Sequence, residues 1–484
     1  MILFKFFILG ILTSFLFPPF FILPLGFVII PYLVELLLKN SHKKSYLTFF
    51  YYGFFYGLGF LAVFLSWIHN PFLVFDDTKS FAILSILLPI FISIFFGIGF
   101  IIYKFIKNLL FIIIITPFIF LFIEFIISNF LYGFPWISYS LILSNNLVGF
   151  YLLKYYGTLA SSFIIIFSFT IPCWFIYKKK FKINNLIKFS YLTLLLFLIF
   201  PFTLNYSNEY KKSNELNIDI HQIFSPIKNI DKKKVEEIII NKIKNSNSEY
   251  IIFAENNYPY LITESNDITL TKHLETNQKV VIGGTKEIEG KFYNSFLFIE
   301  KDKIQYFHKK ILVPFGEFLP FRKYIQFMDK ISGTTDYTIG NIDRLIISKE
   351  NINILPIICY EILFDQIYKN LNKDQIDLLI NITNDSWFGT KVGPYQHLYL
   401  ARIKSLVANK PLVRVSNNGI SAVIDNDGNI IKFSKLNQKS NLTHKLKINY
   451  EKNYFLAHKI FYYYLIILFI FFLAFNWYKR NEDR

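Results

Sequence analysis

The sequence of 484 residues predicts an α-helical transmembrane domain, followed by one extramembrane domain and a final transmembrane helix. Two observations lead to this prediction. Hydrophobic residues make up 53% of the chain and phenylalanine occurs 58 times, which exceeds the usage of soluble globular proteins. The apolar residues are also unevenly distributed, because residues 1–204 and 459–477 are almost continuously apolar, whereas residues 205–457 mix polar and apolar positions.

Seven apolar segments before residue 205 have the length of membrane spans, since crossing the hydrocarbon takes roughly 20 apolar residues. These segments are residues 3–16, 19–38, 47–67, 81–102, 109–130, 156–177 and 187–204, and residues 459–477 form an eighth. We therefore predict eight spans and three parts of the chain. They are a membrane domain at 1–204, an extramembrane domain at 205–457, and a C-terminal helix with a short tail at 458–484.

Lysines gather in every second loop of the membrane domain. They are Lys39, Lys43 and Lys44 after the second span, Lys104 and Lys107 after the fourth, and Lys178, Lys179, Lys180, Lys182 and Lys188 around the turn after the sixth. The positive-inside rule assigns these loops to the cytoplasm. Both termini are then predicted to be cytoplasmic, and residues 205–457 to lie on the opposite side of the membrane.

Two other classes of protein fit the composition less well. The formal net charge of +17 is compatible with nucleic-acid binding, but no basic stripe interleaved with aromatic residues is present, so we predict no nucleic-acid partner. Transporters carry ionisable residues along a path inside the membrane. Here the spans contain mainly Glu35, near a span end, and Glu124, for which the sequence suggests no role.

The chain has two cysteines, Cys173 within the sixth predicted span and Cys359 in the extramembrane domain. An extracytoplasmic domain folds where disulfides form, yet Cys359 has no second cysteine in its own domain to pair with. A lone thiol of this kind is either a small core hydrophobe or a nucleophile. The cysteine count alone leaves both interpretations open.

The residues around Cys359 place it at a strand-to-helix turn. Residues 354–358, ILPII, predict a short buried strand, and residues 362–371, ILFDQIYKNL, have apolar positions at helical spacing. The backbone N–H groups at a helix N-terminus stabilise a thiolate. We therefore expect the pKa of Cys359 to lie below that of an ordinary cysteine, about 8.5, and the turn to present the thiol to a site.

Two further stretches offer a base and a cation for such a nucleophile. In SEYIIFAENNYPY, an apolar strand runs directly into Glu255, and in YFHKKILVPFGEFLP, Lys309 and Lys310 stand beside an apolar run. Taken singly, Glu255 also fits a solvent-exposed acid in a loop, and the two lysines also fit an ordinary basic turn. The eight histidines show no metal-ligand spacing, so we predict neither a metal nor a cofactor.

Five stretches taken together resemble the apolipoprotein N-acyltransferase family, the membrane-embedded branch of the nitrilase superfamily. They are YGFPWISYS, KKILVPFGEFLP, CYEILF, NDSWFG and GPYQHLYLARIKSLVANKPLVRVSNNGISAVID. The resemblance implies that residues 205–457 form an α/β nitrilase-like sandwich (αββα), with two sheets flanked by helices. It also implies a catalytic triad of Glu255 as general base, Lys309 as the cation at the oxyanion, and Cys359 as nucleophile.

Other residues take roles from the same resemblance. Glu317 and Glu361 match acids that support the site, and Trp387 and Trp136 match aromatic positions that bind substrate. The sequence departs from the family pattern at Ile311, where a histidine is usual.

The function implied by the resemblance is ping-pong acyl transfer. A phospholipid, phosphatidylethanolamine in the family, would donate an acyl chain to the cysteine as a thioester. The N-terminal amine of a diacylglyceryl-cysteine apolipoprotein would then accept it. The expected location is the bacterial inner membrane, as a multi-pass monomer whose catalytic domain is periplasmic. Two alternatives remain at this point: a membrane-tethered carbon–nitrogen hydrolase (amidase) that uses water as acceptor, and a non-enzymatic scaffold or transporter with a degenerate domain.

Overall fold

The computed structural model describes residues 1–40, 45–106, 109–176, 214–448 and 454–482. Short gaps fall at 227, 229, 264–267, 325–328, 330–332, 342–343, 349, 369–370 and 372–374. The chain forms two compact units. The helical unit comprises Met1–Ser66, Leu84–Asn208 and Tyr454–Arg484, and the α/β unit comprises Trp67–Ile83 and Glu209–Asn453. Residues 67–83 thus pack with the α/β unit, although the sequence grouped them with the membrane domain.

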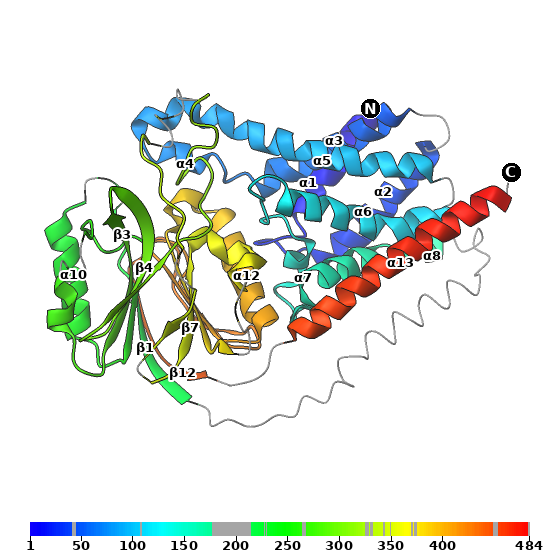
Figure 1. The fold of residues 1–484 in the computed structure, drawn as a ribbon. Coiled ribbons are helices and arrows are strands. Elements are labelled where there is room, and N and C mark those ends of the chain that lie inside the picture. Colours follow the sequence, from blue (N-terminus) through cyan, green and yellow to red (C-terminus); the bar gives the residue numbers. More distant parts are fainter. Residues whose placement is uncertain are drawn as a thin grey trace. The chain divides into compact units, whose positions relative to one another are not determined.

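The helical unit consists of apolar helices joined by short 3-10 turns (Figure 1). Its helices are α1 (Ile2–Ser14), α2 (Gly26–Asn40), α3 (Tyr46–Phe64), α5 (Leu87–Ile101), α6 (Leu109–Asn129), α7 (Leu147–Phe169), α8 (Ile171–Ile176) and α13 (Phe455–Glu482). Helix α3 packs against both α1 and α5. Glycines allow this close approach, because a Cβ on Gly10 would lie 2.0 Å from the carbonyl oxygen of Tyr56, and one on Gly59 would lie 2.0 Å from that of Phe7.

Within the described residues, five helical stretches are long and apolar enough to cross a membrane. They are Tyr46–Phe64, Asp76–Phe105, Phe111–Asn129, Leu147–Cys173 and Phe455–Ala474. These correspond to the predicted third, fourth, fifth, sixth and eighth spans. The first two predicted spans form helices of only 13 and 15 residues, and the predicted span at 187–204 lies outside the described residues. The predicted count of eight spans is therefore not confirmed.

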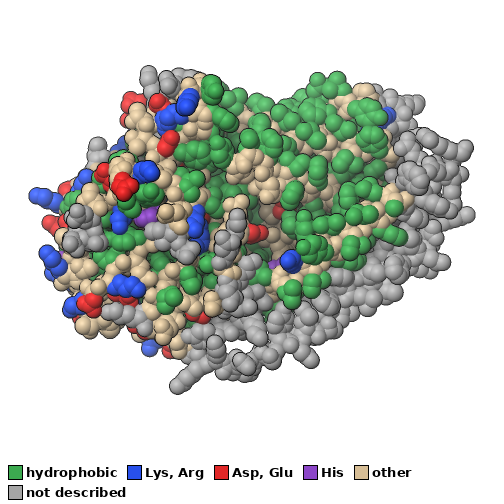
Figure 2. Space-filling model, in the orientation of Figure 1, with side chains coloured by type: hydrophobic (Ala, Val, Ile, Leu, Met, Phe, Trp, Pro, Cys, Tyr) green, Lys and Arg blue, Asp and Glu red, His purple; other side chains and the backbone are tan. Residues whose placement is uncertain are grey.

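The surfaces of the two units differ in chemistry. Hydrophobic side chains cover much of the helical unit, whereas lysine, arginine, aspartate and glutamate are frequent on the α/β unit (Figure 2). Large apolar side chains such as Val28, Leu47 and Leu87 are more than half exposed on the helical unit. Such exposure is the pattern of a lipid-facing surface, because lipid solvates apolar side chains.

Glu124, which had no predicted role, is a buried carboxylate on α6. It accepts hydrogen bonds from the hydroxyl of Ser138 at 2.7 Å, the backbone N–H of Tyr139 at 3.1 Å and the hydroxyl of Ser162 at 3.3 Å. Two of these donors lie in the loop after α6 that also carries Trp136. The carboxylate therefore holds this loop against α6 and α7, which satisfies a polar group that is otherwise costly among apolar helices.

The α/β unit contains two sheets, each with six strands among the described residues. The first has the order β12-β1-β2-β3-β4-β5, with strands Ser440–Ile448, Asn214–Gln222, Tyr250–Phe253, Lys279–Ile288, Lys291–Ile299 and Ile304–His308. The second has the order β11-β10-β9-β8-β7-β6, with strands Ile430–Phe433, Ala422–Ile424, Leu412–Ser416, Leu378–Thr383, Asn353–Ile358 and Ile346–Ile347. The strand predicted at 354–358 is confirmed as β7.

Two helices cover the outer faces of these sheets, α10 (Lys232–Lys244) on the first and α12 (Gly393–Ala408) on the second (Figure 1). Helix α10 is amphipathic: Val235, Ile239 and Ile243 recur every fourth residue and pack into the core of the first sheet. The predicted two-sheet α/β sandwich with flanking helices is therefore confirmed.

Parallel strand pairing places the polar residues that follow several strands at the same edge of each sheet. Strand β2 pairs in parallel with β1 and β3, and β8 pairs in parallel with β7 and β9. Glu255 follows the end of β2, Cys359 follows β7, and Asn384 follows β8. Residues beyond the carboxyl ends of parallel strands are the usual position of sites in α/β folds.

Candidate active site

Cys359 follows β7 directly and begins the short 3-10 segment η9 (Cys359–Leu363). Its φ is +50°, a left-handed conformation that non-glycine residues rarely adopt. The helix predicted over 362–371 is wrong for the described residues there. The chain instead forms η9 and a second 3-10 segment, η10 (Asp365–Tyr368), because Phe364 between them is extended. The resulting turn buries the thiol, with 6% of Cys359 exposed.

Glu255 lies two residues beyond β2, with 5% of the residue exposed. Both carboxylate oxygens have fixed donors. Oε1 accepts from the side-chain amide of Asn294 at 2.8 Å, and Oε2 accepts from the backbone N–H of Asn384 at 2.8 Å. Gly283 makes room for this turn, since a Cβ there would lie 2.6 Å from the Cα of Glu255.

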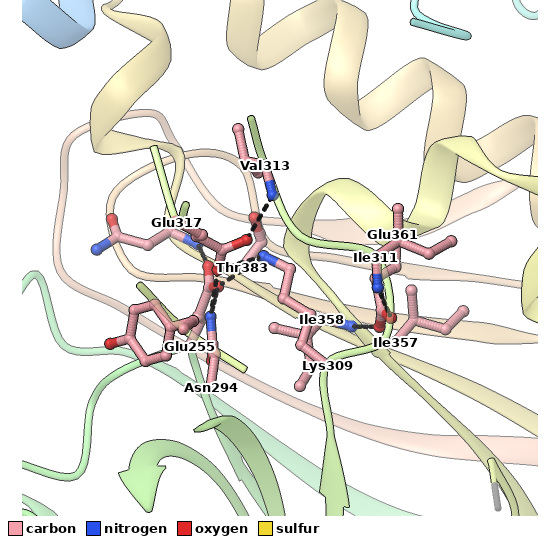
Figure 3. A network of polar contacts seen from close by, with 12 residues as sticks. Glu255, Asn294, Lys309, Ile311, Val313, Glu317, Ile357, Ile358, Glu361 and Thr383 are labelled. Atoms are coloured by element: carbon pink, nitrogen blue, oxygen red, sulfur yellow. Dashed lines mark hydrogen bonds and ion pairs between the residues drawn. The ribbon is translucent and has the colours of Figure 1, made fainter. Parts of the chain in front are cut away.

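Lys309 follows β5 directly and is 1% exposed. Its ammonium lies 2.8 Å from Oε1 of Glu317 and 3.5 Å from Oε1 of Glu255 (Figure 3). The backbone holds it on both sides, because its N–H donates to the carbonyl of Asn294 at 2.8 Å and its carbonyl accepts from Gly340 at 2.9 Å. The structure thus brings Lys309, rather than Lys310, to the two carboxylates.

The amide of Asn294 on β4 joins the two carboxylates that flank Lys309. It donates to Oε1 of Glu255 and to Oε1 of Glu317, each at 2.8 Å. Glu317 also accepts from the backbone N–H of Val313 at 2.8 Å, which closes the loop after Lys309. Sequence reasoning missed Asn294. The available signal was an amide residue that stands two positions before the apolar run FLF at residues 296–298.

Glu361 ties the Lys309 loop to the Cys359 turn. It is fully buried and pairs with Arg344 through contacts of 2.6 and 2.9 Å. It also accepts from the backbone N–H groups of Lys310 at 2.8 Å, Ile311 at 3.2 Å and Ile358 at 3.0 Å. Burial would raise the pKa of Glu361, but the guanidinium and the backbone N–H donors together outweigh burial and lower it. Arg344 was also missed by sequence reasoning.

The charges around Cys359 differ from the expectation of a stabilised thiolate. Burial, and next the negative charge of Glu255, raise the pKa of Cys359 above its usual range, despite the opposing effect of Lys309. The prediction of a lowered pKa is therefore wrong, and the thiol is protonated at neutral pH. Burial also raises the pKa of Glu255, while Lys309 opposes that shift. Glu255 and Cys359 lie near enough for the charge of Glu255 to raise the pKa of the thiol, so Glu255 is the candidate proton acceptor for it.

The charge of Lys309 is retained despite burial. Burial would lower its pKa, but Glu317 and then Glu255 outweigh this effect and raise it. The ammonium is therefore charged throughout the physiological pH range. Among the described residues, no group of three or more His, Cys, Asp or Glu side chains is arranged to hold a metal ion.

The two tryptophans predicted to bind substrate belong to different units. Trp387 is half-buried on the 3-10 segment η12 (Asp385–Phe388), three residues after Asn384, and its ring centroid lies 6.3 Å from that of Phe75. Trp136 is fully buried in the helical unit and stacks on Phe134 at 6.3 Å. Phe75, which is 39% exposed, was not singled out from the sequence.

Comparisons with known proteins identify the family of the chain. A family model described as carbon-nitrogen hydrolase matches residues 233–454, and one described as apolipoprotein N-acyltransferase N-terminal domain matches residues 9–171. An apolipoprotein N-acyltransferase of Rickettsia typhi is 30% identical and covers 89% of each chain. The enzymes of that name from Rickettsia prowazekii and Wigglesworthia glossinidia brevipalpis are 29% and 30% identical, covering 89% and 82% of this chain and the same shares of their own.

Among solved structures, a CN-hydrolase superfamily protein from Xanthomonas campestris aligns with 48% of this chain and 91% of its own. The identity is 17% and the TM-score 0.36. Because full-length relatives match across both units, and both family models match in order, the chain belongs to the apolipoprotein N-acyltransferase family.

Proposed function

We propose that this protein is an N-acyltransferase that moves an acyl chain from a phospholipid to the N-terminal amine of a diacylglyceryl-cysteine lipoprotein. The observation that carries the proposal is the buried arrangement of Glu255, Lys309 and Cys359 at the carboxyl ends of the strands. A thiol, a carboxylate that can accept its proton and a permanent cation are the parts that acyl transfer through a thioester requires.

The first half-reaction loads the acyl chain onto Cys359. Glu255 takes the thiol proton as the sulfur attacks the ester carbonyl of the phospholipid. Lys309 and a backbone N–H near residue 360 stabilise the oxyanion of the tetrahedral intermediate. The C–O bond then breaks, Glu255 returns the proton to the departing alkoxide, and a lysophospholipid leaves behind a thioester.

The second half-reaction transfers the chain to the lipoprotein. Glu255 takes a proton from the terminal ammonium group, and the free amine attacks the thioester carbonyl. The C–S bond breaks as the amide forms, and the leaving sulfur takes the second proton of the attacking nitrogen. Glu255 releases the first proton to solvent, which restores the thiol and the free carboxylate. The reaction needs no metal, cofactor or nucleotide, because the thioester stores the required free energy.

Glu317, Asn294 and Glu361 support these steps without reacting. Glu317 neutralises and orients the Lys309 ammonium at 2.8 Å. The amide of Asn294 fixes the Glu255 oxygen that faces Lys309. Glu361 sets the spacing between the Lys309 loop and the Cys359 turn through its backbone contacts. Trp387 and Trp136 are proposed to contact the lipid substrates.

The membrane helices keep the enzyme where its substrates are. Both substrates carry long acyl chains, and removing a chain from the bilayer costs about 0.8 kcal/mol per CH₂. An enzyme with apolar spanning helices avoids this cost by binding lipids that remain in the bilayer.

We propose eight spans, cytoplasmic termini and a periplasmic catalytic unit in the inner membrane of a bacterium, as the distribution of lysines indicates. We also propose that the protein acts as a monomer.

A membrane-tethered amidase would use the same three residues with water as acceptor. The match of residues 9–171 to the N-terminal domain of the acyltransferases favours acyl transfer over this alternative. A non-enzymatic scaffold would not retain a base and a cation buried 3.5 Å apart together with a buried thiol, since burying charges without function is costly.

The test follows the acyl chain by mass. Purified protein is incubated with phosphatidylethanolamine vesicles, its intact mass is measured, and a diacylated lipopeptide with a free N-terminal cysteine amine is then added. We expect an acyl mass increment on the wild type that is lost on addition of the peptide and reappears on the peptide N-terminus. Cys359→Ala should show no increment, and Cys173→Ala should behave as the wild type. An adduct that water alone discharges would favour the amidase, and the absence of any adduct would contradict thioester chemistry.

A further inference from the structure

The return segment, residues 337–340, comes back to the site after the loop that follows Glu317, and no step of the proposed chemistry uses it. Its backbone contacts both partners of the buried ion pair. Tyr337 donates its N–H to the carbonyl of Glu317 at 2.8 Å, and Gly340 donates its N–H to the carbonyl of Lys309 at 2.9 Å. Because the side chains of Lys309 and Glu317 also meet at 2.8 Å (Figure 3), these contacts form a closed ring.

The close approach of the return segment to Lys309 requires a glycine. Gly340 is buried, and a Cβ there would lie 2.2 Å from the carbonyl oxygen of His308. That oxygen belongs to the backbone, so no side-chain rotation relieves the clash. An alanine at this position would therefore push the segment away and lengthen its hydrogen bond to Lys309. Gly316, in the same loop, has room for a Cβ, whose nearest neighbour would be Val313 at 3.4 Å.

The side chain of Tyr337 anchors the other end of the return segment to the first sheet. Its hydroxyl lies 3.0 Å from Oγ1 of Thr285 on β3. Thr285 is the register partner of Asn294 on β4, and directly opposed residues of an antiparallel pair project from the same face. Tyr337 is thus attached to the face of the sheet that carries the Asn294 amide. Burial raises the pKa of the phenol, which keeps it a neutral hydrogen-bond partner.

The position of the Lys309 ammonium decides whether it can stabilise an oxyanion, because a donor acts at about 2.7–3.1 Å from the developing charge. Lys309 is the first residue after β5, so the regular pairing of the strand ends before it. Its carbonyl accepts from Gly340, and its ammonium pairs with Glu317, whose own carbonyl accepts from Tyr337. The return segment therefore holds both the backbone of the lysine and the partner of its ammonium.

We propose that Tyr337 and Gly340 are positioning residues for the Lys309 cation. They keep the backbones of Lys309 and Glu317 at the separation at which the ammonium reaches the oxyanion of the tetrahedral intermediate. This role deepens the proposed acyl transfer and rests on it for its catalytic consequence. A second consequence is independent of any acyl substrate, because the positive charge of Lys309 favours the thiolate form of Cys359 and hence its alkylation.

A double-mutant cycle between Gly340→Ala and Lys309→Met tests whether the return segment acts through the cation. The two substitutions are made singly and together in a Cys173→Ala background, so that Cys359 is the only thiol. Two rates are measured on each protein: alkylation by iodoacetamide, and acyl-enzyme formation from phosphatidylethanolamine vesicles by intact mass. Gly316→Ala is the matched control and should keep both background rates. Thermal unfolding in detergent reports on the fold.

We expect Gly340→Ala to slow acyl-enzyme formation on the order of 100-fold while Lys309 is present, as misplacement by about an ångström does, and to slow alkylation as well. With Lys309→Met it should have little further effect, because the cation that it positions is gone. Such coupling in either assay supports the proposal. Equal slowing with and without Lys309, or no slowing, in both assays would overturn it. If alkylation shows the coupling but the background protein forms no acyl-enzyme, positioning stands and the proposed acyl transfer falls.

Tyr337→Phe and Thr285→Val are milder variants that decide the question if Gly340→Ala lowers the unfolding temperature. Each removes the same hydrogen bond, so each should slow acyl-enzyme formation by about two- to tenfold, as the loss of one hydrogen bond does. The double variant should be no slower than either single variant, and the losses should disappear with Lys309→Met. Additive losses, or losses that persist without Lys309, would overturn the role of Tyr337.

Discussion

Asn294 offers the sharpest test of how the general base is tuned. Asn294→Asp is nearly isosteric, but it removes the N–H donors that hold Glu255 and Glu317 at 2.8 Å and places a third carboxyl group between them. The bond from Asn294 stabilises the charged form of Glu255, and Glu317 already raises the pKa of Glu255. The substitution should therefore raise the pKa of Glu255 further above its usual value.

The magnitude follows from the hydrogen bond that is lost. A hydrogen bond to a charged group contributes about 1.5–3 kcal/mol, and one pKa unit corresponds to about 1.36 kcal/mol. Losing the bond to Glu255 thus predicts an upward shift of about one to two pH units in the titration of this carboxyl group. Glu255 must be deprotonated to accept the thiol proton, so activity is lost as pH falls through its pKa. The acidic limb of the pH–rate profile should move to higher pH by that amount.

The assay is single-turnover acylation by phosphatidylethanolamine across the pH range, followed by intact mass. Above the shifted limb, the rate of Asn294→Asp should recover toward that of the wild type. Glu317→Gln is the matched control of opposite sign, because it removes the negative charge that raises the pKa of Glu255, and its acidic limb should move to lower pH. A uniform loss of rate in Asn294→Asp with an unmoved limb would refute the argument, since Asn294 would then act on geometry and not on the charge of Glu255.

Three further predictions concern the cation, the buried ion pair and the substrate wall. Lys309→Met should reduce the rate of acylation by about 10²–10³-fold, as loss of an oxyanion donor does. Lys310→Met should stay near wild type, because Lys310 contacts Glu361 through its backbone N–H and not through its side chain. Equal losses of rate in the two variants would contradict the assignment of Lys309. Arg344→Met leaves Glu361 charged and without its cation in the core, and should lower the free energy of unfolding by about 3–5 kcal/mol. Denaturant unfolding measures this change. An unchanged midpoint would show that the backbone N–H donors alone stabilise the buried carboxylate. Trp387→Ala should raise KM for lipid substrate with alkylation of Cys359 unchanged, and a fall in alkylation would instead place Trp387 in support of the thiol.

Much of the outline was predictable because it depends on local sequence. Apolar segments of sufficient length identify membrane helices without reference to the rest of the chain, and five of them have the required length among the described residues. Apolar runs ending in Glu255 and Cys359 predicted strand ends, and β2 and β7 end within two residues of them. Both strands are buried along almost their whole length, which is typical of parallel strands covered on both faces.

Other features were decided by contacts between distant residues. The helix predicted after Cys359 did not form, because helical spacing of apolar residues also suits two 3-10 turns, of which η9 packs against α12 and β8. The shift in the pKa of the thiol was predicted in the wrong direction for the same reason. A local rule about helix termini could not include the burial and the Glu255 charge that the fold supplies.

The sequence by itself thus determined which residues are able to react and that they are attached to a membrane. Only the tertiary structure decided what surrounds them: Asn294 between two carboxylates, and Arg344 against Glu361. These partners lie 17 to 39 residues apart in the chain, so no local pattern links them. Their effect is electrostatic and directional, and it exists only after burial has removed the water that would otherwise screen it.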